Sequence, residues 1–303
     1  MTVTVSAGLS SIGLRWYETG QAGLSGPLLR LAEECDRAFR TLASVWEAAD
    51  ERHPSALPAE RLQRLDYLHS FPHQATFPAR LDPAHLDEFL AGEPVTESGA
   101  VDLTPLAPVT SVLTPAACYH LYHAHEGSSF SAPVYLTTRN TCYRHEERYE
   151  PLRRQWAFSM REIVCLGTHD ETEAFLAQAR AVVDEFLGLL DLPVAWPTAT
   201  DPFFRPRDNP QYLMQRLQPS KHEATYGGDL AIASVNLHHD HFGAAFGLRR
   251  AGRPVNTACL AFGIERWLWA ITDRHGLDPS DWPSPAQAAV TVATRTVARE
   301  VQL

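Results

Sequence analysis

The alternation of hydrophobic and polar residues predicts two adjacent strands in the middle of the chain, at 132–146 and 155–167, joined by a charged loop. Successive side chains of a strand point to opposite faces, so every second residue of the later strand shares one face. That face is made by Trp156, Phe158, Met160, Glu162, Val164 and Leu166. Glu162 is an acid among apolar residues, and a buried acid is costly unless it is paired or bound to a metal.

Helical spacing of apolar residues predicts helices at 25–50, at 170–190 after the acidic Asp170-Glu171 start, and at 264–276. The first of these is interpreted as a packing or oligomer surface. Further strands are predicted within 224–248 and at 255–263. Because strands are joined by few helices and do not alternate strictly with them, we expect an α+β fold with helices packed on an antiparallel sheet.

Composition limits the class of protein. The chain has 303 residues, of which 45% are hydrophobic, so it can fold around one large core or two. Its formal net charge of −10 argues against broad phosphate binding, although a local basic patch stays open. The start lacks a signal peptide and no apolar run is long enough to cross a bilayer, so we expect no membrane association and a cytoplasmic location. Residues 91–111, rich in Pro, Thr and Ser, are interpreted as an inserted connection.

The two predicted strands carry candidate chemistry on one face. Arg144 and Glu146 alternate onto one face of the first strand, and Phe158 and Glu162 onto one face of the second. An adenine ring stacked on Phe158, with Arg144 neutralising a phosphate, would use such a surface well. From spacing alone, a solvated and salt-bridged sheet face is the simpler interpretation.

The segment "CLAFGIERW", residues 259–267, is a second candidate. An apolar strand leads to Gly263, which permits a sharp turn or the close approach of a ligand. Arg266 follows in the first turn of a helix, where the helix already carries partial positive charge. An anion or a stacked base explains an arginine there better than helix stability does.

Two histidine clusters offer a rival metal site. They contain His120, His123 and His125 in "YHLYHAHE", and His238, His239 and His241 in "LHHDHFG". Strand alternation would place His238 and Asp240 on one face and the other two histidines on the opposite face. Neither cluster has the HExxH spacing of a zinc hydrolase. Three of the five cysteines, Cys35, Cys142 and Cys165, are interpreted as core residues, and the odd, scattered set suggests no disulfide framework.

Taken together, "CYRHE", the charged loop, "FSMREIVCLG" and later "CLAFGIERW" resemble motifs 2 and 3 of class II aminoacyl-tRNA synthetases. With "VLTPAACYHLYHAH", "DPFF" and "SVNLHHDHFG", the chain looks like the amino acid:[carrier protein] ligases, which are homologues of the catalytic core of the atypical seryl-tRNA synthetases of methanogens. The likeness runs from about Tyr67 to Trp282. We expect one catalytic domain over 1–303, with a core at 67–285 and a poorly matched helical portion at 1–66.

The resemblance implies an antiparallel sheet flanked by helices, in a homodimer. It also implies a catalytic zinc held by two cysteines and a glutamate, and the matching positions are Cys118, Glu162 and Cys259. Three protein ligands leave a fourth position open, which would take the amino group of a small amino acid.

For ATP, the resemblance implies that Arg144 contacts the α-phosphate, Glu146 the adenine amino group, and that Phe158 and Arg266 enclose the adenine ring. The two arginines would also be catalytic, because they neutralise the charge that develops on phosphate. Glu223 matches an acid near ATP and Mg²⁺.

The acceptor of the activated amino acid is the remaining question. The chain has no separate basic domain or coiled-coil arm, and its net charge is negative, so the phosphopantetheine thiol of a carrier protein fits better than tRNA. An acidic carrier would need a basic contact, for which Arg249, Arg250 and Arg253 are candidates, although a solvated turn explains them equally well. The alternatives are a synthetase-like enzyme with a small-molecule or tRNA acceptor, and a non-catalytic paralogue.

Overall fold

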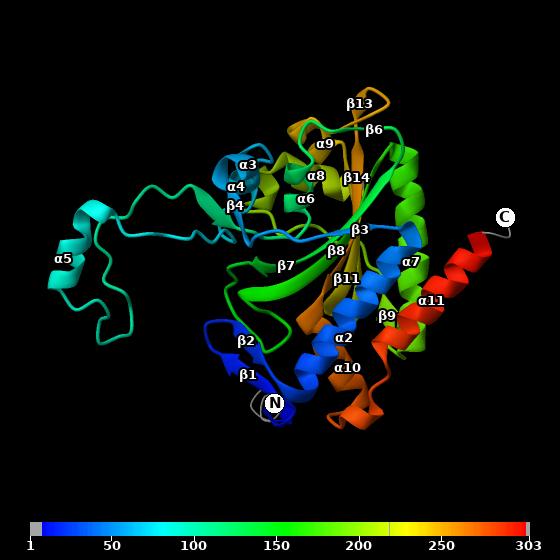
Figure 1. Ribbon diagram of the computed structural model, residues 1–303, viewed down its shortest axis with the longest axis horizontal. Helices are drawn as coiled ribbons and strands as arrows, with labels where there is room; N and C mark the ends of the chain where they lie inside the picture. Colours follow the sequence, from blue (N-terminus) through cyan, green and yellow to red (C-terminus); the bar gives the residue numbers. More distant parts are fainter. Residues whose placement is uncertain (1–7, 218, 301–303) are drawn as a thin grey trace.

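The structure of the protein is a computed structural model in which residues 8–217 and 219–300 are described. Within them, a seven-stranded sheet with the order β3-β7-β8-β14-β11-β10-β9 forms the centre (Figure 1). Only β3 and β7 run parallel in this sheet, and the other neighbours are antiparallel. The strands are β3 (Ala49–Glu51), β7 (Val134–Tyr143), β8 (Ala157–Gly167), β9 (Val194–Ala195), β10 (Lys221–Tyr226), β11 (Leu230–His239) and β14 (Asn256–Gly263). The predicted α+β fold is confirmed.

Long helices cover one face of this sheet (Figure 1). They are α2 (Gly26–Ala43), α7 (His169–Leu189) and α10 (Ile264–His275), and α11 (Pro285–Glu300) packs on α2 and α7. Their apolar sides share a buried cluster with Ile163 of β8 and with Phe262 of β14, whose ring stacks on Phe39 of α2 with 4.1 Å between centroids. The three predicted helices are present, but the first ends at Ala43, before a 3-10 turn and β3, and not near residue 50. Helix α11, whose sequence mixes Ala, Val and Thr without a clear stripe, was not predicted.

Helix α7 begins directly after β8, and its start is fixed locally. The Thr168 hydroxyl accepts a hydrogen bond from the Glu171 N–H, and the Glu171 carboxylate accepts one from the Thr168 N–H. This capping box satisfies two backbone donors that a helix start leaves open. The helix therefore leaves β8 at a defined point and returns along the covered face.

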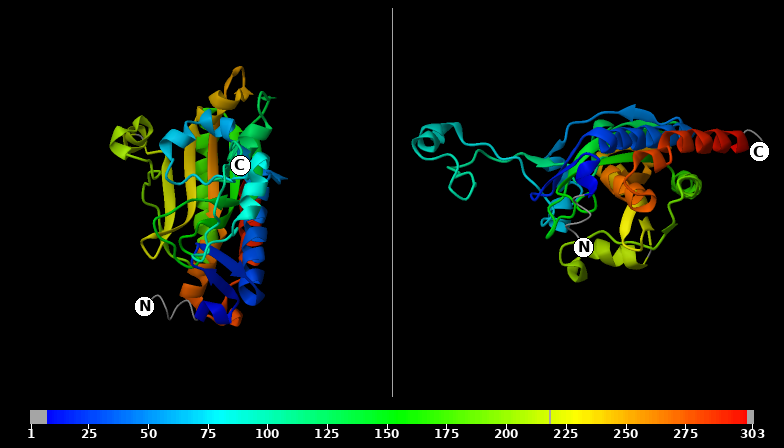
Figure 2. Two further views of the ribbon diagram at one scale, coloured as in Figure 1. Left: turned by 90° about the vertical axis from the view of Figure 1, so that its left-hand side faces the viewer. Right: turned by 90° about the horizontal axis from the view of Figure 1, so that it is seen from below.

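Short helices lie on the opposite side of the sheet, toward one end of it (Figure 2). They are α3 (Ala59–Gln63), α4 (Tyr67–Ser70), α6 (Tyr119–Ala124), α8 (Pro210–Leu217) and α9 (His241–Phe246). A second buried cluster joins Tyr122 and Phe242, from two of these helices, to Val164 and Leu166 of β8. The rest of this face borders a cavity.

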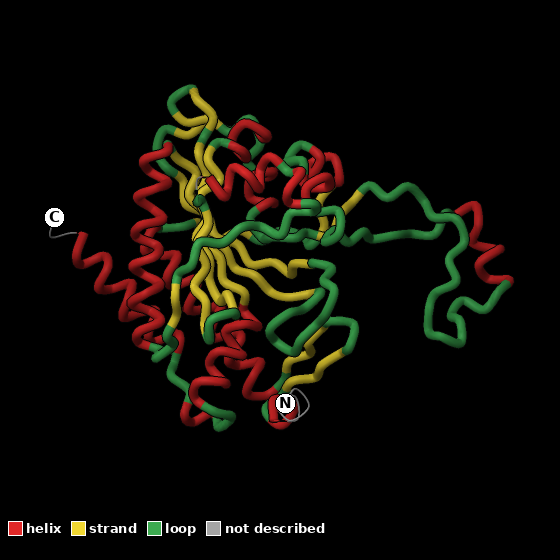
Figure 3. Tube along the Cα trace, turned by 180° about the vertical axis from the view of Figure 1, so that it is seen from behind, coloured by secondary structure: helices red, strands yellow, loops and turns green. Residues whose placement is uncertain are grey.

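The remaining elements are small and lie around the sheet (Figure 3). The strands are β1 (Leu14–Tyr17) with β2 (Gln21–Leu24), β4 (Ala56–Pro58) with β5 (Ser111–Leu113), and β6 (Ser129–Phe130) with β12 (Arg249–Arg250) and β13 (Arg253–Pro254). The 3-10 turns are η1 (Ser44–Trp46), η2 (Pro83–His85), η3 (Pro206–Asp208) and η4 (Pro279–Asp281). Helix α5 (Leu86–Ala91) lies in a long loop, and an antiparallel β-bridge between Leu81 and Leu106 joins the two ends of this loop. Among the described helices, none has the length and apolar character needed to span a membrane.

Candidate active site

A cavity of about 500 Å³ lies over the open face of the sheet, where β8, β14, β11 and β10 run side by side. Its wall contains all eight residues that the resemblance assigned to zinc and ATP. These are Cys118, Arg144, Glu146, Phe158, Glu162, Glu223, Cys259 and Arg266. Residues that are far apart in the chain are therefore brought together at one place.

Arg144 and Phe158 form one wall of the cavity. The guanidinium carbon of Arg144 lies 5.3 Å from the Phe158 ring centroid, and Arg144 Nε donates a hydrogen bond of 2.9 Å to the Pro115 carbonyl. The predicted strand placement of Arg144 and Glu146 is wrong, because β7 ends at Tyr143. The chain leaves the sheet after the hydrogen bond from the Arg144 N–H to the Trp156 carbonyl, and both side chains reach the cavity from the following loop.

Glu146 is held by an ion pair inside that loop. Arg154 Nη1 lies 2.6 Å from Glu146 Oε2. The Glu146 backbone N–H donates to the Tyr149 hydroxyl. The carboxylate is therefore oriented before any ligand binds, which suits an acceptor for an amino group.

Arg266 supplies a second guanidinium from the first turn of α10, as the sequence predicted. Its Nε donates to the Arg153 carbonyl and its Nη1 to the Ala231 carbonyl, both at 2.9 Å. Burial, followed by the nearby Arg144 charge, lowers the pKa of Arg266 to about 10. Arg144 and Arg266 both remain cationic at neutral pH, and the guanidinium nitrogens named above donate to uncharged backbone carbonyls. This half of the cavity therefore favours an anion.

Cys118, Glu162 and Cys259 meet at another part of the wall. Their exposed fractions are 3%, 2% and 5%. Glu162 Oε1 accepts a hydrogen bond of 3.0 Å from the Cys118 N–H, and the two thiols lie near this carboxylate and near each other. Burial, and then the neighbouring Cys259 thiol, raise the pKa of Cys118 well above its usual value. The neighbouring Cys118 thiol acts to lower the pKa of Cys259, but burial outweighs it and that pKa is raised too.

Zinc is the metal that this donor set suits. Within the described part of the chain, no group of three or more His, Cys, Asp or Glu side chains is already arranged as a metal site. The donors nevertheless fit the ion chemically, since two thiolates and a carboxylate are common zinc ligands. Three acidic groups buried together, with burial opposing ionisation of both thiols, would be stabilised in their charged forms by a divalent cation.

A group of charged residues, Lys221, Asp201 and Glu223, lies beside this cluster, and only Glu223 was singled out from the sequence. Strand pairing connects the two places, because Cys259, Asn236 and Lys221 are direct partners on β14, β11 and β10. Lys221 Nζ lies 2.8 Å from Asp201 Oδ1 and 3.2 Å from Glu223 Oε1. Burial alone would lower the pKa of Lys221, but the two carboxylates raise it. Strand alternation relates Lys221 to Glu223, whereas Asp201 comes from a loop that no local pattern connects to the strand.

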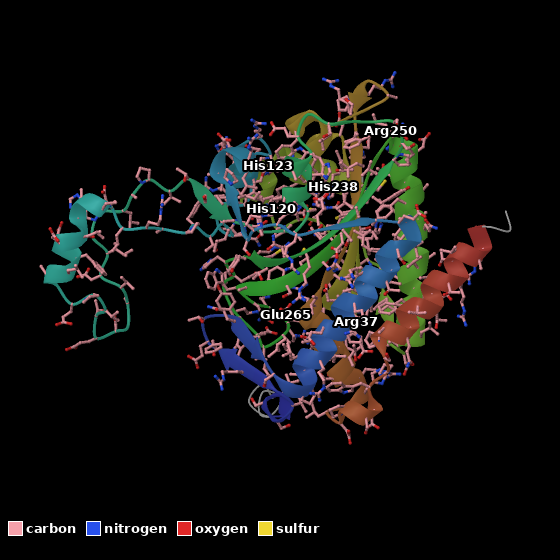
Figure 4. The ribbon with its side chains drawn as sticks, in the orientation of Figure 1. Arg37, His120, His123, His238, Arg250 and Glu265 are labelled. Atoms are coloured by element: carbon pink, nitrogen blue, oxygen red, sulfur yellow. The ribbon has the colours of Figure 1, made fainter. Side chains whose placement is uncertain are left out.

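Glu265 is a further cavity residue that the sequence analysis missed. Both carboxylate oxygens accept hydrogen bonds of 2.9 Å from the Ser159 N–H, so the side chain connects α10 to β8. Burial raises its pKa. It lies away from the labelled histidines, which gather near the other end of the sheet (Figure 4). Its position directly before Arg266 was the one sequence signal that could have identified it.

The six clustered histidines do not converge on one site. His120 stacks on His53 with 5.5 Å between ring centroids, and burial lowers its pKa to about 4. His125 Nε2 lies 2.8 Å from Glu51 Oε1. Contacts of the other four include those of His123 with Glu126, His239 with His169, His241 with Phe242, and His238 with Cys259.

The predicted alternation at 238–241 is also wrong. Strand β11 ends at His239, helix α9 begins at His241, and the register with β14 shifts between Leu237 and His239. His241 and Phe242, at the end of the "SVNLHHDHFG" segment, line the cavity.

The basic turn at 249–253 is only partly available for a partner. Arg250 Nη2 lies 2.6 Å from Glu171 Oε1, and its Nη1 donates to the Ser131 carbonyl. This arginine therefore joins the turn to the start of α7. Arg249 and Arg253 are exposed.

Known proteins similar to this chain identify its family, although no family model matches it. The amino acid–[acyl-carrier-protein] ligase 1 of Bradyrhizobium diazoefficiens is 31% identical over 263 residues, which are 82% of this chain and 79% of that protein. The chain belongs to the amino acid–[acyl-carrier-protein] ligase family. A second member from the same organism, ligase 2, is 31% identical over 285 residues, which are 88% of this chain and 83% of the relative.

This chain shares its fold with a larger synthetase. The crystal structure of M. kandleri SerRS in complex with A. aeolicus tRNASec superposes with a TM-score of 0.76 at 21% identity. The match covers 98% of this chain and 60% of the synthetase chain. The expected class II synthetase fold and the expected family are thus confirmed.

Proposed function

We propose that the protein activates a small amino acid with ATP and transfers it to the phosphopantetheine thiol of a carrier protein. The observation that carries this proposal is the convergence of eight predicted residues on one cavity, with cations at one part and two thiols and a carboxylate at another. The family to which the chain belongs supports the same reaction. The zinc, the residue roles and a homodimer are parts of the proposal.

In the first step, ATP occupies the part of the cavity that holds Arg144, Phe158 and Arg266. Adenine lies between the Phe158 ring and the Arg266 guanidinium, and Glu146 accepts a hydrogen bond from its amino group. Arg144 neutralises the α-phosphate. An oxygen of the amino acid carboxylate attacks the α-phosphorus, the bond to pyrophosphate breaks, and aminoacyl-adenylate forms.

Magnesium is expected to be bound mainly through the phosphates of ATP, as is usual for this ion. Glu223 can add one carboxylate oxygen, because it lines the cavity, where its Oε1 lies 3.2 Å from Lys221 Nζ.

Cys118, Glu162 and Cys259 would hold the zinc ion. When bound, zinc supplies a Lewis acid that favours the unprotonated amino group of the substrate. The three side chains fix where that amino group lies, and therefore where the carboxylate meets the α-phosphate. In the second step, the carrier thiolate attacks the carbonyl carbon and AMP leaves.

The decisive experiment separates activation from transfer. ATP–pyrophosphate exchange is measured with each of the common amino acids, and zinc is measured in the same protein preparation. We expect exchange with one or a few small amino acids and its loss in Cys259→Ala. As a control, Cys35→Ala changes a buried thiol of the helix-covered core and should leave exchange intact.

Transfer is then followed by mass spectrometry of phosphopantetheinylated carrier proteins. A mass gain equal to one aminoacyl group is expected on the holo-carrier and not on the apo-carrier. Exchange without any loaded carrier would favour another acceptor. Absence of both exchange and ATP binding in calorimetry would favour a non-catalytic protein and overturn the proposal.

A further inference from the structure

The N-terminal hairpin β1–β2 lies beside the loop that joins β7 to β8 (Figure 1). Residues 18–20 make its turn, and Gly20 is buried there with a φ of 85°, a left-handed conformation that suits glycine. The Gly20 carbonyl accepts the backbone N–H of Trp156 at 2.8 Å and that of Ala157 at 3.4 Å. Phe158 follows directly, so the turn of the hairpin fixes the start of β8 beside the ring that the proposed nucleotide site uses.

Gly20 also accommodates the side chain of Tyr149, from the same loop. A Cβ atom at residue 20 would lie 2.7 Å from Tyr149 Cγ and 2.8 Å from each of its Cδ atoms. Carbon atoms in contact normally stay about 3.5–4.0 Å apart, so the ring occupies space that only glycine leaves free. Rotation of the ring about its own axis leaves Cγ in place. Any larger residue at position 20 would therefore displace the whole side chain or the loop backbone.

Tyr149 is connected in turn to Glu146, the proposed acceptor for the adenine amino group. Its hydroxyl accepts the Glu146 N–H at 3.5 Å. The next residue, Glu150, exchanges backbone hydrogen bonds of 2.7 and 3.0 Å with Arg154, whose guanidinium lies 2.6 Å from Glu146 Oε2. A displacement of Tyr149 is therefore passed on to the ion pair that orients Glu146.

One backbone position thus reaches both groups that would contact adenine. Gly20 acts on Phe158 through the start of β8, and on Glu146 through Tyr149. Neither Gly20 nor Tyr149 is among the described residues that line the cavity, so neither would touch ATP. Ordinary packing of a hairpin over a loop is the simpler interpretation, and it predicts a loss of stability without a selective effect on the nucleotide.

We propose that the β1–β2 hairpin positions the adenine-binding side of the cavity, with Gly20 and Tyr149 as positioning residues. This inference rests on the nucleotide site of the proposed function and extends it to the N-terminal segment. The hairpin contacts the loop that carries Glu146, whereas Cys118 and Cys259 come from other segments. A change at Gly20 should therefore affect ATP and leave the amino acid unaffected.

ATP–pyrophosphate exchange kinetics of the full-length protein test this selectivity. Gly20→Ala should raise KM for ATP at least about tenfold, because a shift of about 1 Å in a positioned group is costly. KM for the amino acid should stay within about twofold of the wild type. The preference for ATP over inosine triphosphate, which has an oxygen in place of the amino group, should also shrink, because Glu146 no longer meets that group.

Gly99→Ala is the matched control. Gly99 also lies in a turn, with a φ of 79°, but no heavy atom lies within 4 Å of the position that its Cβ would take. The substitution therefore brings the same backbone strain without displacing a neighbour. Both KM values and the preference for ATP should match those of the wild type.

Variants at Tyr149 test the route from the hairpin to Glu146. Tyr149→Phe keeps the ring against Gly20 and removes the hydroxyl, so KM for ATP should rise only a few-fold. Tyr149→Ala should raise it more and also clears the space beside residue 20. Adding Gly20→Ala to Tyr149→Ala should then raise KM for ATP by less than about twofold, because the new Cβ meets no ring. A loss of folding alone would not produce this non-additivity.

The outcomes separate this inference from the proposed function. A wild-type KM for ATP in Gly20→Ala, or in Tyr149→Ala if the first variant does not fold, overturns the inference and leaves the proposed function standing. An equal rise in KM for ATP and for the amino acid overturns it as well, since that result indicates general disruption. Effects that multiply in the double variant overturn the route through Tyr149. Absence of ATP-dependent exchange in the wild type overturns both.

Discussion

Arg161 and Glu162 are neighbours in β8, yet they lie in opposite electrostatic surroundings. Arg161 faces the long helices, where its Nε lies 2.6 Å from Asp36 of α2 and its Nη1 lies 3.0 Å from Asp50 of β3. Glu162 faces the cavity, where it accepts from the Cys118 N–H and lies against two thiols. A buried charge whose partners are side chains of the opposite sign stabilises the fold, whereas one placed among further acids points to a ligand.

The largest expected effect is on stability at the helix-covered face. Arg161→Met should lower the free energy of unfolding by about 3 kcal/mol, near the lower end for breaking a buried ion pair, because Asp36 and Asp50 still reach solvent. Urea denaturation measures this value. Arg139→Met is the control, because Arg139 is the cross-strand partner of Arg161 but is exposed, and it should lose less than about 1 kcal/mol. Equal losses of unfolding free energy in Arg161→Met and Arg139→Met would contradict the stabilising role of the buried ion pairs of Arg161.

The next effect is on catalysis at the cavity face. Glu162→Gln keeps an acceptor for the Cys118 N–H but removes the negative charge, so ATP–pyrophosphate exchange should fall at least about 100-fold in kcat/KM. Its free energy of unfolding should change by less than about 1 kcal/mol. Arg161→Met should show the opposite pattern, in which stability falls while the exchange rate per folded molecule stays at the wild-type value. A Glu162→Gln protein that retains exchange and zinc would remove the reason for a metal at this position.

Two phenylalanines extend the comparison across the sheet. Phe158→Leu should raise KM for ATP about tenfold with little loss of stability, because the ring contributes stacking in the cavity. Phe262→Leu, whose ring stacks on Phe39, should lower the free energy of unfolding by about 1 kcal/mol and leave KM unchanged. The KM for ATP in pyrophosphate exchange and the free energy of unfolding in urea are measured for both variants. A stability loss in both with no change in KM would place Phe158 in the core rather than in the nucleotide site.

The smallest effect concerns a charge that is paired at the end of β8. The hydrogen bond from Arg250 and then the Thr168 N–H hold the pKa of Glu171 below its usual value, against the effect of burial. A carboxyl whose pKa is lowered by folding stabilises the protein above its unfolded pKa, and this contribution is lost as pH falls through the folded value. The wild type should therefore exceed Glu171→Gln by about 1 kcal/mol at pH 7. The difference should shrink as pH falls below about 4.5, the ordinary value for Glu.

Thermal unfolding between pH 7 and pH 3 measures this dependence. Glu173→Gln is the control on the same helix, since its carboxylate is exposed and lies near His169. A difference between wild type and Glu171→Gln that stays constant over this range would mean that the capping contacts, rather than the charge, stabilise α7.

Much of the fold and part of the candidate site could be predicted from sequence. Period-two alternation separated Glu162 from Arg161, and helical spacing identified α2, α7 and α10, because these patterns depend on neighbours in the chain. The motif resemblance identified eight residues of one cavity. The N-terminal hairpin β1–β2 and helix α11 were missed because short strands and an Ala/Thr-rich helix lack a strong period.

The sequence by itself determined which face of β8 each side chain would occupy, where α7 begins, and which residue types could serve ATP and zinc. Only the tertiary structure decided what those side chains meet. Arg161 finds its acids 125 and 111 residues away in the chain, and Glu162 meets the backbone N–H of Cys118 across 44 residues. Periodicity is a local property of the backbone, whereas partners depend on strand order and register, which long-range packing sets.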